Sequence, residues 1–295
     1  MKKTACAIIV NGGAGGLNFP ERRRNGLVKA VSIGYSILKQ GGSSLDAVER
    51  ASMILEHATV FNAGTGSYLN LVGEAEMDAS IMTSKMEFGA VAAMKNVRHP
   101  ISVARLVMEK TDHLFLCGQG ANKFARIMGI KPYNPETKEK RRLWQRKKRN
   151  LKHSYFPKLK EIADSYGTIG VVAIDQNGLI SAANSTGGIS LNMPGRVGDT
   201  PVIGGGIYAD KHGGVTATGH GEEIMRHLLS FRAVCFMSSH QARIAGKMAI
   251  DYATKYGCRC GLVGLDKKGG ILCANNTRAM SWCYIKNGRM KVFKY

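Results

Sequence analysis

Two threonines near the middle of the chain have the spacing of a site for nucleophilic chemistry. Thr168 opens the strand-like run GTIGVVAID, and Asp-Gln-Asn-Gly at 175–178 is a strong hairpin signal. Two registers are compatible with this turn, and they put Thr168 opposite Ser185 or opposite Gly187. In either register Thr186 is a close cross-strand neighbour of Thr168, so two hydroxyls meet at one end of the hairpin.

A second hairpin supplies groups suited to a developing negative oxygen. Its register brings Thr218 beside the glycine run at 204–206, and Gly219 and Gly221 follow in ATGHGEE, where a helix opens. Backbone N–H groups of a glycine-rich turn at the start of a helix are natural donors to an oxyanion. We therefore expect the ends of the two hairpins to share one site.

The loop between these hairpins carries a cation and an anion three residues apart. Arg196 and Asp199 lie in PGRVGDTP, where proline and glycine fix the backbone. They complement a carboxylate and an ammonium, the pair that the α-groups of a free amino acid carry. Each feature also has an ordinary structural explanation, namely a threonine pair, a surface ion pair and a helix cap. Their convergence on one locus favours a binding site.

The composition is that of a globular protein, with 44% hydrophobic residues and 36 glycines among 295 residues. The chain has no run of about 18 apolar residues, the length of a membrane span, and the apolar run at 5–10 is too short for a signal peptide. Seven cysteines in mostly apolar contexts indicate free thiols in a reducing compartment. Cys258 and Cys260 lack two further ligands at short spacing, which favours buried thiols over a metal site. We expect a cytoplasmic protein with no membrane partner.

Periodicity and turn signals predict a series of helices and hairpins. Helices are expected at 22–39, 43–57, 100–111, 120–128, 222–231 and 241–254, strands at 4–10, 67–71, 76–82, 88–94 and 113–117, and hairpins at 169–184, 202–218, 262–274 and 283–293. Repeated hairpins with segregated helices argue for an α+β fold of antiparallel sheets covered by helices. The glycine-rich loop at 11–16 fails as a dinucleotide fingerprint, because Asn18 stands where its third glycine is required.

The segment from 131 to 152 breaks this pattern. KPYNPETKEKRRLWQRKKRNLK holds two prolines and nine lysines or arginines from Lys138 to Lys152. One interpretation is a nucleic-acid-binding or nuclear-targeting patch in which Trp144 stacks on a base, and the net charge of +21 attracts phosphate polymers whatever the function. Because blocks of like charge repel one another, we favour a solvated, flexible linker over about 131–160.

Several motifs, in order along the chain, resemble one enzyme family. GTIGVVAID, ISAANSTGG, PGRVGDTPVIGGGIYA and ATGHGE look like the β-subunit core of the isoaspartyl peptidase/plant-type L-asparaginase family, and NGGAGG, GGSSLDAVERA, LEHATVFNAGTGSYLN and EMDASIM resemble its α-subunit. The likeness covers nearly the whole chain except residues 131–160. It implies a single N-terminal-nucleophile hydrolase domain over 1–295, a four-layer αββα sandwich of antiparallel sheets covered by helices.

The resemblance also implies that the chain cuts itself between Gly167 and Thr168. The products would be an α subunit of 1–167, ending in the basic linker as a mobile tail, and a β subunit of 168–295. Thr168 would then hold both nucleophile and base, because its freed α-amino group, with a pKa near about 8, accepts a proton at neutral pH. Glycine at 167 tolerates the unusual backbone geometry that attack on its own carbonyl demands.

The family's catalytic roles carry over to matching positions of this sequence. Thr186 would orient the Thr168 hydroxyl, and Thr218 and Gly219 would donate to the oxyanion. Asn62, in FNAG, matches the family's active-site asparagine near the nucleophile. No catalytic cofactor is expected. A structural sodium ion is implied at the backbone carbonyls of Leu55, Glu56, Ala58, Phe61 and Ala63.

The substrates implied by the resemblance are L-asparagine and isoaspartyl (β-aspartyl) dipeptides. Arg196 and Asp199 would hold the α-carboxylate and α-ammonium, with Gly219 and Gly221 beside the substrate, and the reaction would release L-aspartate. Alternatives are a relative that cuts other aspartyl bonds, such as glycosylated asparagine or a protein, and an inactive relative that binds nucleic acid through its basic segment. Relatives pair two αβ units, so a dimer of heterodimers is expected.

Overall fold

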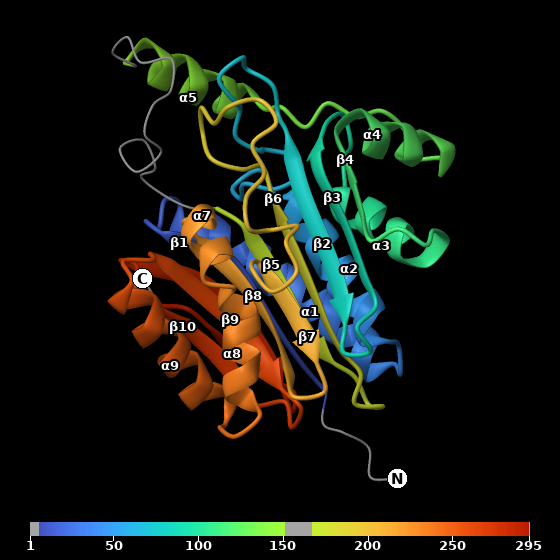
Figure 1. The fold of residues 1–295 in the computed structure, drawn as a ribbon, viewed down its shortest axis with the longest axis vertical. Helices are drawn as coiled ribbons and strands as arrows, with labels where there is room; N and C mark the ends of the chain where they lie inside the picture. The colour runs from blue at the N-terminus through green and yellow to red at the C-terminus, as the bar shows by residue number, and fades with distance from the viewer. Residues whose placement is uncertain (1–5, 151–166, 295) are drawn as a thin grey trace.

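The structure, a computed structural model, describes residues 6–150 and 167–294 and is built on two β-sheets (Figure 1). The larger sheet has the strand order β12-β11-β1-β5-β6-β2-β3-β4. Its neighbouring strands are antiparallel except β3 and β4, which are parallel. The strands are β1 (Ala7–Gly15), β2 (Met77–Thr83), β3 (Phe88–Met94), β4 (Phe115–Cys117), β5 (Ile169–Ile174), β6 (Ile180–Thr186), β11 (Ala279–Lys286) and β12 (Arg289–Val292).

The smaller sheet has the order β10-β9-β8-β7 and is antiparallel throughout. Its strands are β7 (Ile207–Asp210), β8 (Gly213–Gly219), β9 (Cys260–Asp266) and β10 (Ile271–Asn275). It consists entirely of strands from the second half of the chain. The larger sheet mixes both halves, since β1 lies between β5 and β11.

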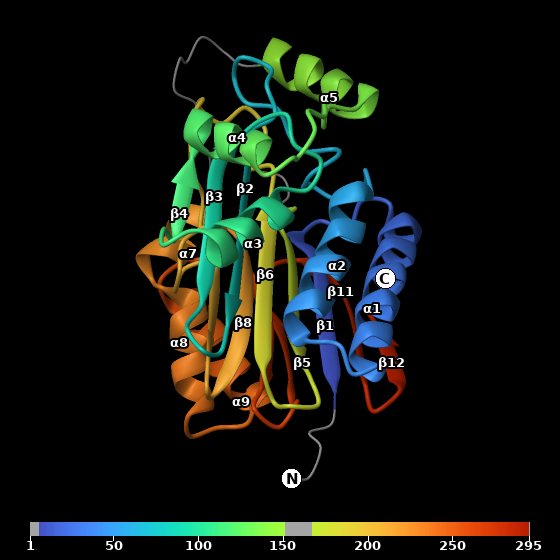
Figure 2. The ribbon, with the colours of Figure 1, turned by 90° about the vertical axis from the view of Figure 1, so that its right-hand side faces the viewer.

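Helices cover the outer face of each sheet (Figures 1 and 2). α1 (Pro20–Lys39), α2 (Ser44–His57) and α3 (Pro100–Lys110) pack on the larger sheet, and α8 (Leu229–Met237) and α9 (Ala242–Lys255) on the smaller. The remaining described helices are α4 (Gly118–Ile127), α5 (Lys138–Arg149) and α7 (Gly221–Arg226). The result is a four-layer αββα sandwich, which confirms the predicted fold class.

The alternation of side chains along β1 explains the layers. Ile8 and Val10 point into the cluster formed with the helices, while Ala7 and Ile9 point into the cluster between the two sheets. Successive side chains of a strand face opposite sides of its sheet. Since both faces are covered, all four residues are fully buried, and the strand reads as a continuous apolar run.

Most predicted elements are present, with instructive exceptions. Residues 67–70 are irregular in place of the expected strand, and Leu71 opens a turn in which the Asn70 side chain accepts from the backbone N–H groups of Val72 and Glu74. The helix expected at 222–231 is split into α7 and α8 at Leu228, whose φ of 45° is left-handed. β1 also runs on through the glycine-rich loop to Gly15.

The close approach at Gly12 shows why that loop is rich in glycine. A Cβ atom there would lie 2.3 Å from Cε1 of Phe61 and 2.9 Å from Oγ of Ser281. Glycine at 12 therefore lets β1 pass close to neighbouring side chains of the protein.

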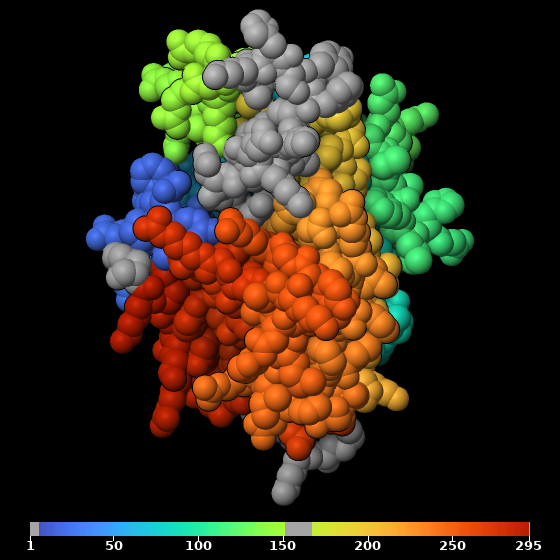
Figure 3. Space-filling model, turned by 60° about the vertical axis from the view of Figure 1, so that its left-hand side comes forward, coloured from blue at the N-terminus to red at the C-terminus, as the bar shows by residue number. Residues whose placement is uncertain are grey.

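The expectation of a flexible linker is wrong for residues 138–149, which form α5 at one end of the molecule (Figures 1 and 3). Its N-cap, Thr137, accepts a hydrogen bond from the Lys140 backbone N–H. Lys140 is only 8% exposed and its ammonium lies 4.1 Å from the centre of the Tyr68 ring. Like charges can share a helix here because several of the basic side chains form hydrogen bonds or cation–π contacts. Residues 151–160 of the expected linker lie outside the described ranges.

None of the helices described here is long and apolar enough to cross a membrane.

Candidate active site

Thr168 lies immediately before β5 and faces Thr186 at the end of β6. β5 and β6 pair with Ile169 opposite Ser185 and Ile174 opposite Ile180, a register midway between the two predicted ones. The Thr168 Oγ1 donates to the Thr186 Oγ1 at 3.2 Å, and both residues are at most 6% exposed. The predicted meeting of two hydroxyls is therefore present in the structure, although neither predicted register is correct.

The turn between β5 and β6 explains the register. Asp175 pairs with Leu179, whose backbone oxygen accepts from the Asp175 N–H at 3.1 Å. The Asp175 Oδ1 accepts in addition from the N–H groups of Asn177 and Leu179. Three residues thus form the loop, with Gly178 at φ 80° as its left-handed residue.

Asn62 lies against the peptide bond that precedes Thr168. Its backbone N–H points to the Gly167 oxygen at 3.4 Å, and its side chain is fixed by a bond to the Gly188 oxygen (2.6 Å) and by the Tyr68 N–H (2.7 Å). A Cβ atom at Gly167 would lie 2.5 Å from the Asn62 Cβ. Only glycine fits at 167 without displacing Asn62.

The end of β8 brings the expected oxyanion donors, Thr218 and Gly219, next to Thr168 and Thr186. Thr218 is fully buried, and within the described part of the chain its Oγ1 has no hydrogen-bond partner. Gly219 has a φ of 147°, and a Cβ atom there would lie 2.3 Å from the Arg259 oxygen. This hydroxyl is therefore free to donate to an oxygen of a bound ligand.

A small pocket joins these groups to the substrate loop, as we name residues 188–199. The residues that line it are Gly167, Thr168, Thr186, Gly188, Ile189, Arg196, Asp199 and Gly219. Thr218, Gly221 and Asn62 are adjacent to it but do not line it. Gly221 lies against two of the lining residues, since a Cβ atom there would lie 2.8 Å from the Asp199 Oδ1 and 2.9 Å from the Arg196 Nη2.

Arg196 is held by Glu222, a residue for which the sequence interpretation assigned no role. The Arg196 Nε and Nη2 donate to the two carboxylate oxygens of Glu222, both at 3.0 Å. This bidentate pair is geometrically specific and fixes the plane of the guanidinium. The available signal was an acidic residue in the first turn of α7, in GHGEE, where the helix dipole favours a carboxylate.

Asp199 is 4% exposed, and its Oδ2 has no hydrogen-bond partner among the described residues. Burial raises the pKa of Asp199 to about 7, against the opposing effect of the Arg196 charge. Beneath it Asp78, whose pKa burial raises to about 6, accepts from the N–H groups of Ala93 (2.9 Å) and Gly198 (3.3 Å). The pocket therefore presents a desolvated carboxylate that a cation would stabilise.

The turn expected to hold sodium has a donor set that suits a hard cation. Within it the carbonyls of Leu55, Glu56 and Ala58 accept from the N–H groups of Ala58, Thr65 and Phe61. Each carbonyl oxygen retains a second lone pair for a cation. Among the described residues no cluster of three or more His, Cys, Asp or Glu side chains has the geometry of a metal site.

The fold and the site together define a class of protein. A four-layer αββα sandwich of two sheets flanked by helices is the arrangement of the N-terminal-nucleophile hydrolases. Residues 4–294 match the sequence model of the family described as Asparaginase, and the chain belongs to that family.

Several relatives are similar over almost their whole length. The chain is 46% identical to the plant-type L-asparaginase of Pyrococcus horikoshii, covering 96% of this chain and 97% of that protein. It is 42% identical to the isoaspartyl peptidase/L-asparaginase of Rattus norvegicus (96% and 87% covered) and 41% identical to that of Xenopus laevis (98% and 94% covered).

Proposed function

We propose that the protein is a self-cleaving threonine hydrolase that releases L-aspartate from L-asparagine and from isoaspartyl dipeptides. The observation that carries this proposal is the pocket in which the hydroxyl pair of Thr168 and Thr186 lies beside Arg196 and Asp199. Such a pocket offers a nucleophile, a carboxylate-binding cation and an ammonium-binding anion to one small ligand. The names of the relatives state the same two activities.

Self-cleavage would begin with attack of the Thr168 Oγ1 on the carbonyl carbon of Gly167. The peptide C–N bond breaks, the nitrogen takes up a proton, and an ester joins Gly167 to the Thr168 oxygen. Water then hydrolyses the ester and leaves a Gly167 carboxylate and a free Thr168 amine. The Asn62 N–H, 3.4 Å from the Gly167 oxygen, supports this step because it faces the atom on which negative charge develops.

Hydrolysis would use the same oxygen with the new amine as base. The amine accepts the proton of the Thr168 hydroxyl as it attacks the side-chain carbonyl of the substrate. Thr186 orients the hydroxyl, and Thr218 with Gly219 donates to the oxyanion. Ammonia or an amino acid leaves with the proton, and water releases L-aspartate from the resulting ester.

Recognition of the α-groups would follow from the charges of the substrate loop. Glu222 engages Nε and Nη2 of Arg196, so Nη1 remains directed at an incoming carboxylate. The unpartnered Oδ2 of Asp199 would accept from the α-ammonium. An isoaspartyl peptide qualifies because its α-carboxylate is free while its β-carboxyl is the acyl group.

We also propose a dimer of αβ heterodimers in the cytoplasm, with a structural sodium ion at the turn from 55 to 63. The carbonyls of Leu55, Glu56, Ala58, Phe61 and Ala63 would hold the ion. Light scattering tests the assembly, for which twice the mass of one processed chain pair is expected. A higher melting temperature in NaCl than in choline chloride at equal ionic strength is expected for the ion, and equal values would contradict it.

Intact mass spectrometry of aged, purified protein tests the proposed function most directly. Two chains are expected, one ending at Gly167 and one beginning at Thr168. Thr168→Ala should give one uncut chain that releases no aspartate from β-Asp-Leu. A wild-type chain that stays intact, or a Thr168→Ala variant that still hydrolyses the dipeptide, would refute the mechanism.

A further inference from the structure

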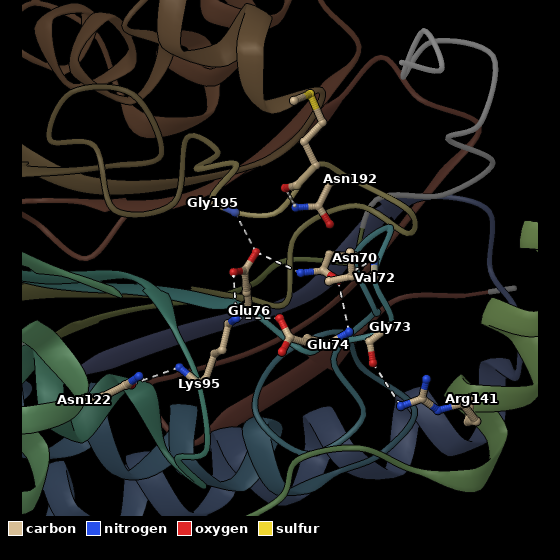
Figure 4. A network of polar contacts seen from close by, with 11 residues as sticks. Asn70, Val72, Gly73, Glu74, Glu76, Lys95, Asn122, Arg141, Asn192 and Gly195 are labelled. Atoms are coloured by element: carbon tan, nitrogen blue, oxygen red, sulfur yellow. Dashed lines mark hydrogen bonds and ion pairs between the residues drawn. The ribbon is translucent and has the colours of Figure 1, made fainter. Parts of the chain in front are cut away.

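The turn at residues 69–76, here called the bridging turn, lies between α5 and the substrate loop (Figure 4). It contacts both through hydrogen bonds to its backbone and side chains. Neither the proposed chemistry nor the proposed recognition of the α-groups uses it. Its contacts on each side show what it does.

One face of α5 binds the backbone of the bridging turn. Arg141, Trp144 and Lys148 follow the helical spacing i, i+3, i+7 and so share a face. They donate to the carbonyl oxygens of Gly73 (2.9 Å), Asn70 (2.8 Å) and Leu71 (3.2 Å). Each of these three side chains therefore has its own acceptor in the turn.

The fit at Gly73 is close. Its φ is +84°, and a Cβ atom there would lie 2.6 Å from the Arg141 Nη1 and 3.1 Å from the Trp144 Cζ2. The guanidinium of Arg141 and the ammonium of Lys148 lie over the Trp144 ring at 5.1 and 4.5 Å from its centre. Trp144 is the centre of this contact.

The inside of the bridging turn is organised by one side chain. The Asn70 Oδ1 accepts from the N–H groups of Val72 (3.1 Å) and Glu74 (3.0 Å), and its Nδ2 donates to the Glu76 Oε2 at 3.1 Å. A shift of the turn at Asn70 is therefore transmitted to Glu76.

The opposite side of the turn holds the substrate loop. The Leu71 N–H donates to the Asn192 oxygen and the Leu191 N–H to the Leu69 oxygen, both at 2.8 Å. Leu191 has a left-handed φ of 65°, a strained conformation that these bonds help to maintain.

Glu76 holds the loop directly beside the arginine of the site. Its Oε2 accepts from the Gly195 N–H at 2.8 Å, one residue before Arg196. The carboxylate is 9% exposed and its Oε1 lies 3.3 Å from the Lys95 Nζ. An ion-paired, nearly buried carboxylate is a strong acceptor for a backbone N–H.

We propose that α5 positions the substrate loop through the bridging turn, with Trp144 and Glu76 as positioning residues for Arg196. Residues 138–149 of the basic segment thus support substrate binding by holding the substrate loop in place. The identity of the substrate in this inference rests on the proposed function. The positioning of the substrate loop rests only on the hydrogen bonds described above.

The experiment compares Trp144→Ala and Trp144→Phe with Arg142→Gln in the processed protein. Arg142 is exposed on the other face of α5, where it lines a cleft with Phe19 and Arg23. Its replacement removes a positive charge from the same helix without touching the bridging turn. Trp144→Phe keeps one aromatic ring and removes the N–H donor together with the second ring of the indole.

Steady-state kinetics with β-Asp-Leu give the first readout. Trp144→Ala is expected to raise KM roughly tenfold, because it removes both the N–H donor and the ring contacts with Gly73, Arg141 and Lys148, with kcat within about twofold because Thr168 is not displaced. Trp144→Phe should give a smaller rise and Arg142→Gln none. Equal effects of Trp144→Ala and Arg142→Gln, or a loss confined to kcat, would overturn the proposal.

Hydrogen exchange gives a second readout that does not depend on activity. The amides of Leu191 and Gly195 should exchange faster in Trp144→Ala and Glu76→Gln than in the wild type. Their exchange rates should be unchanged in Arg142→Gln. If the wild-type protein proves inactive on β-Asp-Leu, the proposed substrate is wrong while this result still decides the positioning role. Unchanged exchange in Trp144→Ala would refute that role.

Discussion

Protonation of Asp199 should weaken substrate binding as the pH falls from 8 to 5. In the free site, burial raises the pKa of this carboxyl to about 7. The charge of Arg196 lowers the pKa, and the charges of Glu222 and Asp78 raise it. The α-ammonium of the substrate binds only the ionised form. Because a carboxyl with this pKa is half protonated near pH 7, binding should approach its full strength only near pH 8 and be progressively lost as the pH falls through 7.

The size of the effect follows from the fraction of ionised Asp199. With a pKa of about 7, KM relative to its high-pH limit should rise about elevenfold at pH 6 and about 100-fold at pH 5. The proposed cut would free the Thr168 amine, whose pKa is about 8, and its protonation would slow the chemical step and so lower kcat. The ionisation of Asp199 should therefore be seen in KM, and that of the Thr168 amine in kcat.

Steady-state kinetics with β-Asp-Leu between pH 5 and 7.5 check this expectation. Asp199→Asn is the control, because its KM should be high and independent of pH over the same range. A wild-type KM that stays flat from pH 5 to 7.5 would refute the reasoning. So would an Asp199→Asn variant that keeps the wild-type pH profile.

Three further predictions follow from the geometry. Gly167→Ala should slow self-cleavage about tenfold or more, because its Cβ would lie 2.5 Å from that of Asn62; a time course of intact mass measures this, and an unchanged rate would contradict it. Thr186→Val should lower kcat roughly 10- to 100-fold by removing the partner of the Thr168 hydroxyl at 3.2 Å, and full activity would exclude an orienting role. Leu27→Ala, at a fully buried position of α1, should cost about 2–5 kcal/mol of unfolding free energy, measured by denaturant titration; a loss below about 1 kcal/mol would contradict the packing.

The sequence predicts the elements of this fold well where one local signal decides the conformation. Pro100 marks the start of α3, and the turn at 175–178 gives the β5–β6 hairpin. The exact register depends on the hydrogen bonds of one side chain, which the sequence pattern does not show. Asp175 binds two backbone N–H groups and extends the loop to three residues, so both simpler registers fail by one position.

The parts that sequence reasoning missed depend on partners distant in the chain. α5 was expected to stay solvated because its charges repel one another, yet Trp144 finds its acceptor 74 residues away at Asn70. Glu222 was visible as a helix-opening carboxylate, but only the fold shows that it meets Arg196. Local patterns carry no information about such pairings.

The position of β1 in the larger sheet determines what a cut before Thr168 does to the molecule. β1 belongs to the first product chain, while β5 and β11, hydrogen-bonded along its two edges, belong to the second. β2 of the first chain likewise pairs with β6 of the second. The seam between the products therefore passes through the middle of a buried sheet, and neither chain can leave without unfolding the other. The proposed cut would thus convert a unimolecular folding problem into a bimolecular one, so recovery after denaturation should depend on protein concentration in the cut protein and not in its uncut precursor.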